Sequence, residues 1–156
     1  MLAIYRPIVT DTATSFELEP PSEEEFRERI SRTKENNPWL VMEIDGRLVG
    51  YAYASDFRPR PAYAATRETT VYVHPEYQRS GVGAELMGAL LDELVRRGAH
   101  VAVAFIALPN DPSVELHERI GYEYVGILHG VGRKLERWHD IGIWELDLST
   151  RLRGLQ

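Results

Sequence analysis

The chain contains no cysteine, and this absence excludes several kinds of site. It leaves no disulfide bond, no zinc site built on thiolates and no cysteine nucleophile. No apolar run approaches the ~20 residues that a membrane-spanning helix needs. The N-terminal stretch MLAIYRPIVTDT also lacks the basic segment and long apolar core of a secretory signal. We therefore expect a cytoplasmic protein with no membrane partner.

The chain has fewer basic than acidic residues, and its formal net charge is -6. A general nucleic-acid-binding protein usually carries a basic face, so this class is not favoured, although a local basic pocket for an anionic cofactor is compatible with the composition. A metal site formed by His129, His139 and Asp140 has no support from ligand spacing. The 156 residues suit one domain with a sizeable core, and we expect a single domain over residues 1–156.

Apolar periodicity and turn residues indicate the order of helices and strands. Ser22 and Glu25 form a capping-box pattern at the start of a helix, and Asp45-Gly46 is a strong hairpin signal. Residues 2–9 fit the tail of a helix, and residues 130–132 are expected to form a loop. The other expected elements are helices at residues 22–34, 84–97 (buried stripe Leu86, Leu90 and Leu94) and 113–120, and strands at residues 39–44, 48–57, 66–74, 101–108, 122–128 and 138–148. Antiparallel strands come first and βαβ units later, which is typical of an α/β or α+β sandwich with a mixed sheet.

Residues 71–83, VYVHPEYQRSGVG, join a β-rich run to the helix that follows it. The first backbone N–H groups of that helix have no partner within it, and the peptide dipoles add partial positive charge there. Gly81 and Gly83 remove side chains that would keep a ligand away from the backbone. Arg79 adds a formal positive charge. The stretch therefore predicts a cradle for a phosphate or pyrophosphate.

Glu68 precedes the uncharged run TTVYV in the strand before this cradle. A carboxylate among apolar neighbours tends to have a raised pKa, which suits a general base. An outward-facing glutamate on a half-exposed strand is the commoner case. The strand alone leaves both interpretations open.

Several other polar residues have a structural and a functional interpretation. His117 on the short helix fits a structural hydrogen bond as well as proton transfer. Asn110 fits a simple Asx turn as well as a ligand contact. Arg58 and Arg60 lie in a proline-stiffened loop, and a guanidinium suits recognition of a carboxylate or phosphinate, although a solvated loop is the usual setting for such arginines.

The segment QRSGVG, residues 78–83, matches the Q/R-x-x-G-x-G/A signature of the GCN5-related N-acetyltransferases, in which this turn binds the pyrophosphate of acetyl-CoA. Further blocks resemble the phosphinothricin N-acetyltransferase subgroup: TRETTVYV at 66–73, LPNDPSV at 108–114, His117-Glu118 with Gly121-Tyr122, and Trp138-His139-Asp140. The resemblance runs from roughly Leu2 to Leu148. Ordered blocks at family spacing are far more specific than a lone glycine turn.

The resemblance implies the fold of this family, but without the strand that usually begins it. The expected fold is that of the acyl-CoA N-acyltransferases, α/β (α+β), with a mixed central β-sheet flanked by helices. Family members usually begin with a further β-strand and the first half of a helix. This chain is therefore expected to lack the usual first strand, which would leave an unpaired sheet edge.

The resemblance also assigns roles, with acetyl-CoA as co-substrate and no metal. Glu68 is the expected general base, and His117 ranks second, at a position where many relatives carry a tyrosine that protonates the departing thiolate. The Val73 N–H is a candidate oxyanion donor on a strand edge that faces the pantetheine arm. The residues expected to bind the cofactor are Val71, Tyr72, Val73, Arg79, Ser80, Gly81, Val82, Gly83, Ala84 and Asn110. The residues expected to bind the acceptor are Arg58, Pro59, Arg60, Glu68, Thr69 and Thr70.

The implied activity is acetyl transfer to the α-amine of a small amino acid such as phosphinothricin, methionine sulfoximine or methionine sulfone. Attack is expected to be direct, because no cysteine is present to form an acetyl-enzyme. Other acceptors (a polyamine, an aminoglycoside or a protein N-terminus) and a non-catalytic acyl-CoA-binding module stay open, although the arginine loop speaks against a cationic acceptor. Phe16 and Tyr63 are candidates to line the pocket. Subgroup members are commonly homodimers, and residues 138–140 have no role that the residues themselves reveal.

Overall fold

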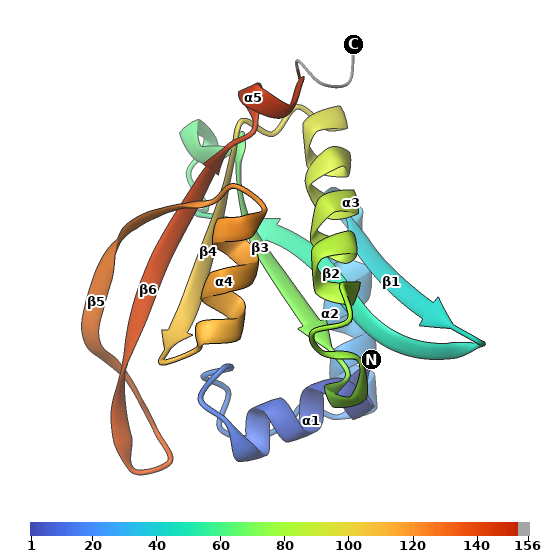
Figure 1. The fold of residues 1–156 in the computed structure, drawn as a ribbon, viewed down its shortest axis with the longest axis vertical. Coiled ribbons are helices and arrows are strands. Elements are labelled where there is room, and N and C mark those ends of the chain that lie inside the picture. Colours follow the sequence, from blue (N-terminus) through green and yellow to red (C-terminus); the bar gives the residue numbers. More distant parts are fainter. Residues whose placement is uncertain (153–156) are drawn as a thin grey trace.

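The computed structural model describes residues 1–152 and contains one mixed β-sheet flanked by helices (Figure 1). The elements are α1 (Leu2–Asp11), α2 (Glu23–Asn36), β1 (Trp39–Ile44), β2 (Arg47–Asp56), the 3-10 turn η1 (Pro61–Tyr63), β3 (Thr66–Val73), the 3-10 turn η2 (Pro75–Tyr77), α3 (Val82–Arg96), β4 (Val101–Leu108), α4 (Asp111–Arg119), β5 (Glu123–Lys134), β6 (Arg137–Asp147) and α5 (Ser149–Leu152). The strand order is β1-β2-β3-β4-β6-β5. Strands β3 and β4 run parallel, and the other neighbours are antiparallel. The predicted fold is confirmed, with β1 at one edge of the sheet and a helix as the first element.

Local hydrogen bonds and backbone angles explain why a predicted helix start and a predicted hairpin turn form where they do. Ser22 Oγ accepts the Glu25 N–H at 3.2 Å, and Glu25 Oε2 accepts the Ser22 N–H at 2.7 Å, so the capping box at α2 is confirmed. Asp45 and Gly46 have φ angles of 51° and 75°, as a type I′ hairpin turn requires. Both features depend on neighbouring residues alone.

Strand β5 differs from the sequence-based expectation at residues 130–132. The predicted loop is wrong, because β5 continues through this segment and the hairpin turns at Leu135 and Glu136. Pairing with β6 is irregular here, and the Asp140 carboxylate accepts the Gly130 N–H at 2.8 Å. The glycines therefore accommodate a bulge within a strand.

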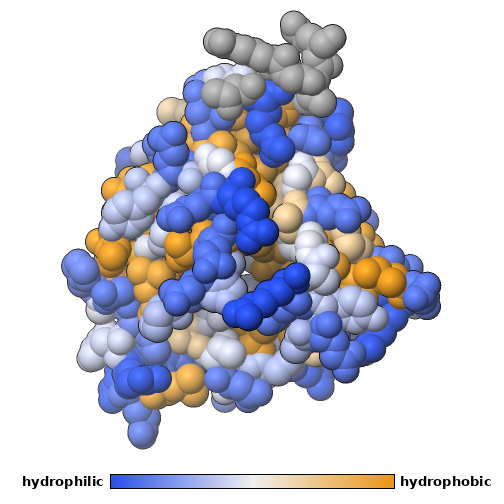
Figure 2. Space-filling model, viewed as in Figure 1, coloured by the Kyte–Doolittle hydropathy of each residue, from blue (hydrophilic) through white to orange (hydrophobic). Residues whose placement is uncertain are grey.

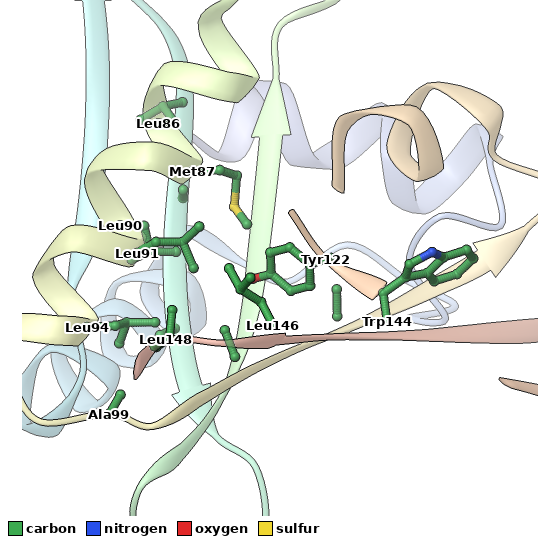
Figure 3. Close-up of a cluster of buried hydrophobic side chains, with 14 of the residues drawn as sticks. Leu86, Met87, Leu90, Leu91, Leu94, Ala99, Tyr122, Trp144, Leu146 and Leu148 are labelled. Atoms are coloured by element: carbon green, nitrogen blue, oxygen red, sulfur yellow. The ribbon is translucent and has the colours of Figure 1, made fainter. Parts of the chain in front are cut away.

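The main core lies between α3 and the sheet. Leu86, Leu90 and Leu94 form the predicted stripe and are at most 2% exposed. Figure 3 shows these side chains on the face of α3 that points toward Tyr122 and Leu146. This packing fixes the start of α3 relative to the strands.

The two faces of the sheet carry different helices. Helices α3 and α4 lie on one face, and α1 and α2 lie on the other, where Tyr5 and Phe26 pack with Tyr51 (Figure 1). Side chains along a strand alternate between faces, so neighbouring residues of β3 meet different helices. None of the helices within residues 1–152 combines the length and apolarity needed to cross a membrane.

Candidate active site

A gap opens in the sheet where β3 and β4 separate. The two strands pair only at Thr66, Arg67 and Glu68, and they diverge beyond this point (Figure 1). A cavity of about 310 Å³ lies at this divergence and is lined by residues of both strands. In Figure 2 the same face of the molecule is hollowed near its centre, with hydrophilic residues around the opening. An opening between strands leaves main-chain groups available to a ligand.

The ladder between β2 and β3 decides which main-chain groups face this gap. The His74 N–H donates to the Val49 carbonyl at 2.8 Å. Because bonded residues alternate along an antiparallel pair, the polar groups of Tyr72 also point toward β2, whereas those of Val71 and Val73 point toward the gap. Val71 and Val73 therefore have the orientation that the expected main-chain hydrogen bonds to the pantetheine arm need. Tyr72 contributes its side chain to the cavity lining instead.

Glu68 lines the cavity from the last paired position of β3. Its side chain is half-buried, and this burial raises the pKa of the carboxyl above its ordinary value. The raised pKa agrees in direction with what its apolar neighbours suggested. The carboxyl therefore has the position and the basicity that a proton acceptor in the cavity needs.

The two threonines that follow Glu68 differ in their surroundings. Thr69 is buried, and its hydroxyl lies 2.7 Å from the Tyr122 hydroxyl and 3.3 Å from the Val103 carbonyl. These contacts join β3 to the core beneath α4. Thr70 shares the face of Glu68 by strand alternation and is the better placed of the two for an acceptor contact.

His117 lines the same cavity from α4 and is 4% exposed. Its Nδ1 lies 2.7 Å from the Ser113 carbonyl, which can only accept, so Nδ1 carries the proton. Nε2 is then an acceptor, and it has no hydrogen-bond partner within the described residues. Burial lowers the pKa of the imidazole and keeps it neutral near pH 7. This form of His117 accepts a hydrogen bond at Nε2 rather than donating one.

Asn110 caps α4 and also lies at the cavity. Its side-chain oxygen accepts the Ser113 N–H at 3.4 Å and caps α4. The residue also lines the cavity. The bond to the N–H three residues on is a helix cap rather than the simple Asx turn that the sequence suggested, and a ligand contact of Asn110 stays a prediction.

The predicted anion cradle lies at the start of α3, directly after β3 and η2. Arg79 and Gly81 have φ angles of 60° and 94°, and no side chain caps the helix. Ser80 instead donates its hydroxyl to the Tyr77 carbonyl at 2.5 Å. The N–H groups of the first turn consequently lack a capping acceptor, as an anion site requires. Because Val82 is buried, it can serve a ligand only through its backbone.

The arginine loop lies outside the cavity lining. Arg58, Pro59 and Arg60 are exposed after β2, and the structure does not bring them to Glu68. The Arg58 guanidinium lies 5.1 Å from the Phe57 ring centre, and Phe57 stacks at 6.2 Å on Phe105, which does line the cavity. Their role in acceptor binding stays a prediction.

The aromatic residues that line the cavity are partly those expected from the sequence. Phe16 lines the cavity as expected, whereas Tyr63 packs edge-on against Phe57 at 5.6 Å outside it. Sequence reasoning missed Tyr5 and Tyr53, which line the cavity from α1 and β2. Alternation along the strand predicts that Tyr51 and Tyr53 share a face, but only the strand order reveals that Tyr53 reaches the cavity.

Residues 138–140 have structural roles in the β5–β6 hairpin. His139 is buried and donates from Nε2 to the Lys134 carbonyl at 2.9 Å. Asp140 pairs with His129 at 3.0 Å, and Trp138 is 68% exposed. Within residues 1–152, no group of three or more histidine, aspartate or glutamate side chains is arranged to hold a metal ion.

Comparison with known proteins gives matches over most of the chain. The family model described as "Acetyltransferase (GNAT) family" matches residues 5–122. The phosphinothricin N-acetyltransferase of Streptomyces viridochromogenes is 41% identical over 146 residues, which cover 94% of this chain and 80% of the relative. The L-methionine sulfoximine/L-methionine sulfone acetyltransferase of Pseudomonas aeruginosa is 35% identical over 152 residues, which cover 96% and 88%.

A solved structure shares the fold and contains a cofactor. It is a phosphinothricin acetyltransferase of the GNAT superfamily from Sinorhizobium meliloti, in complex with acetyl-CoA. It superposes with a TM-score of 0.90 at 33% identity and covers 94% of this chain and 80% of its own. The two proteins are therefore similar both in fold and in sequence.

Proposed function

Since the chain belongs to the acetyltransferase (GNAT) family and is an acetyl-CoA-dependent N-acetyltransferase, we propose that it acetylates the α-amine of a small amino acid or analogue. Phosphinothricin, methionine sulfoximine and methionine sulfone are the acceptors proposed. The observation that carries the proposal is the cavity between β3 and β4, which is lined by the half-buried side chain of Glu68 and by the edge of β3 at Val71. Relatives named for these acceptors support the substrate class.

In the proposed reaction, the acceptor amine attacks the thioester carbonyl directly. Glu68 removes the proton that the amine loses, because its raised pKa makes it a stronger base than an ordinary glutamate. The Val73 N–H donates to the oxygen on which negative charge develops. The new C–N bond forms as the C–S bond breaks, and the thiolate takes a proton from solvent. The first turn of α3 and Arg79 hold the pyrophosphate.

We propose that His117 positions the bound substrates by accepting a hydrogen bond at Nε2. The support is its buried, neutral and unpartnered nitrogen in the cavity. Replacing it with leucine should lower kcat about tenfold, the effect of one hydrogen bond of ~1.4 kcal/mol. Glutamine, which keeps an acceptor, should retain more activity than leucine. Equal activity in His117→Leu and the parent would remove this role.

We also propose that Arg58, Pro59 and Arg60 recognise the acceptor carboxylate or phosphinate. The support is the chemistry of the guanidinium group and the stacking of Phe57 on Phe105. Arg58→Glu should raise the acceptor KM by about tenfold or more, because a charged hydrogen bond contributes ~1.5–3 kcal/mol. The acetyl-CoA KM should stay constant. Arg32→Glu, on the exposed face of α2, is the matched charge reversal and should change neither constant.

A thiol-release screen tests the proposed acceptor class. It offers the protein acetyl-CoA with phosphinothricin, methionine sulfoximine, methionine sulfone, the common amino acids, spermidine, kanamycin and a peptide. We expect the fastest release with one of the amino acids or analogues. Faster release with spermidine, kanamycin or the peptide would replace the proposed acceptor.

We further propose that residues 1–156 act as one domain in a cytoplasmic homodimer. Exposed apolar side chains along β5 and its hairpin support an interface, since such patches mark contact surfaces. They belong to Tyr124, Val125, Leu128, Val131 and Trp138. Figure 2 shows hydrophobic patches on the side where β5 lies. Sedimentation equilibrium should give twice the 17.8 kDa chain mass, and a constant monomer mass would contradict the dimer.

A further inference from the structure

The loop of residues 12–17 contributes to the lining of the cavity that also contains Glu68. Thr14, Ser15 and Phe16 of this loop line the cavity together with Tyr5 and Tyr53. The loop is the first part of the connection from α1 to α2, and residues 12–22 of this connection contain no helix or strand. Its position therefore depends on the side chains that hold it.

The Phe16 ring of this loop packs against Gly132 of β5, where the lack of a side chain leaves room for it. The ring of Phe16 lies so close to Gly132 that a Cβ built there would be 2.0 Å from Phe16 Cε2 and 2.4 Å from Cδ2. Carbon atoms in contact prefer 3.5–4.0 Å, so the ring could not remain where it is. His139 of β6 contributes a second contact, with its ring centre 6.1 Å from that of Phe16. The hairpin thus defines where the Phe16 ring sits.

A buried cation of β5 provides the other support. Lys134 is 5% exposed, and its ammonium donates to the Ser15 carbonyl at 2.5 Å. The Ser15 hydroxyl lies 2.8 Å from the Tyr5 hydroxyl, so the loop is tied on both sides. The hydrogen bond from His139 to the Lys134 carbonyl closes the hairpin behind this contact. A buried ammonium is seldom tolerated without such partners.

We propose that Gly132 and Lys134 of β5 are positioning residues that set the acceptor specificity of the transferase through the 12–17 loop. Gly132 fixes the Phe16 ring by leaving space for it, and Lys134 fixes the backbone at Ser15. Neither residue lines the cavity, so each acts through a residue that does. The proposal rests on the proposed function, because specificity is defined only for an active transferase.

The first test compares two glycine-to-alanine variants of the same strand. A Cβ at Gly132 meets the Phe16 ring, whereas a Cβ at Gly126 meets nothing within 4 Å. Gly132→Ala should change the ratio of kcat/KM between glycine and methionine sulfoximine as acceptors by about tenfold, the discrimination that small changes in pocket shape bring. Gly126→Ala should leave the ratio unchanged. Equal ratios in both variants and the parent would overturn the proposal.

A double-mutant cycle tests whether the effect passes through Phe16. In a Phe16→Ala background the ring is gone, so adding Gly132→Ala should alter the acceptor ratio by no more than about twofold. An undiminished effect in that background would assign it to the strand itself and overturn the proposed route. Acetyl-CoA binding by calorimetry should stay constant in all variants, which shows that the fold is intact.

Lys134→Met removes the ammonium but keeps most of the apolar stem. It should raise the acceptor KM by about tenfold while the acetyl-CoA KM stays constant, since one buried hydrogen bond to the loop is lost. An unchanged acceptor KM would overturn the role of Lys134. The failure of the proposed function looks different, because the parent chain would then transfer acetyl to no amino acid at all.

Discussion

Replacing Glu68 with glutamine should lower kcat for acetyl transfer by roughly 10²–10⁴-fold, the range that a positioned general base contributes. Glutamine keeps the size of the side chain and removes its ability to take a proton. The dissociation constant of acetyl-CoA should change little, because the anion cradle lies at the start of α3 and is untouched. Glu145→Gln, at an exposed glutamate of β6, is the matched control and should behave as the parent.

The same replacement should change how activity depends on pH. Burial raises the pKa of Glu68, so its carboxyl is protonated and inactive as a base at acidic pH. The value of kcat/KM in the parent should therefore rise with pH through that raised pKa and then level off. The acidic limb should vanish in Glu68→Gln. Turnover close to that of the parent, with an unchanged pH profile, would remove Glu68 from the role of base.

Replacing Gly81 with valine should weaken acetyl-CoA binding by about tenfold or more, a loss of ~1.4 kcal/mol or above. Gly81 has a φ of 94°, where a β-branched residue is strained by roughly 1–3 kcal/mol. The added side chain would also stand beside the N–H groups that should receive the pyrophosphate. The measurement is titration calorimetry with acetyl-CoA.

Gly98 provides the matched control at the other end of the same helix. Its φ of 79° is also left-handed, and neither glycine has an atom within 4 Å of an added Cβ. Gly98→Val should thus lower the melting temperature about as much as Gly81→Val does. Its acetyl-CoA affinity should equal that of the parent. Equal affinities in the two variants would show that the start of α3 does not bind the pyrophosphate.

Local chemistry explains which parts of the fold are predictable from sequence. The capping box of Ser22 and Glu25 and the turn at Asp45 and Gly46 are correct because each needs only neighbouring residues. The loop predicted at residues 130–132 is wrong because β6 and its Asp140 side chain hold that segment in β5. Pairing across strands overrides what the glycines prefer on their own.

In the candidate site, too, the features that depend on neighbouring residues are predictable, and those that depend on the tertiary structure are not. The raised pKa of Glu68 follows from its apolar neighbours, and the uncapped turn at Gly81 follows from its spacing. The different surroundings of Thr69 and Thr70 depend on a long-range contact between the Thr69 and Tyr122 hydroxyls, which no local pattern contains. The tautomer of His117 depends on a carbonyl four residues earlier in α4. Where the loop of Arg58 lies relative to the cavity also needs the strand order.

The most direct measurement of the central claim is the identity of the product. The protein is incubated with acetyl-CoA and methionine sulfoximine or phosphinothricin, and the mixture is resolved by tandem mass spectrometry. We predict one added acetyl group on the α-nitrogen, formed together with free CoA in equal amount, and none when acetyl-CoA is omitted. Tight binding of acetyl-CoA in calorimetry, without acetylation of these or any other amino acid, would contradict the claim and leave a non-catalytic acyl-CoA-binding protein.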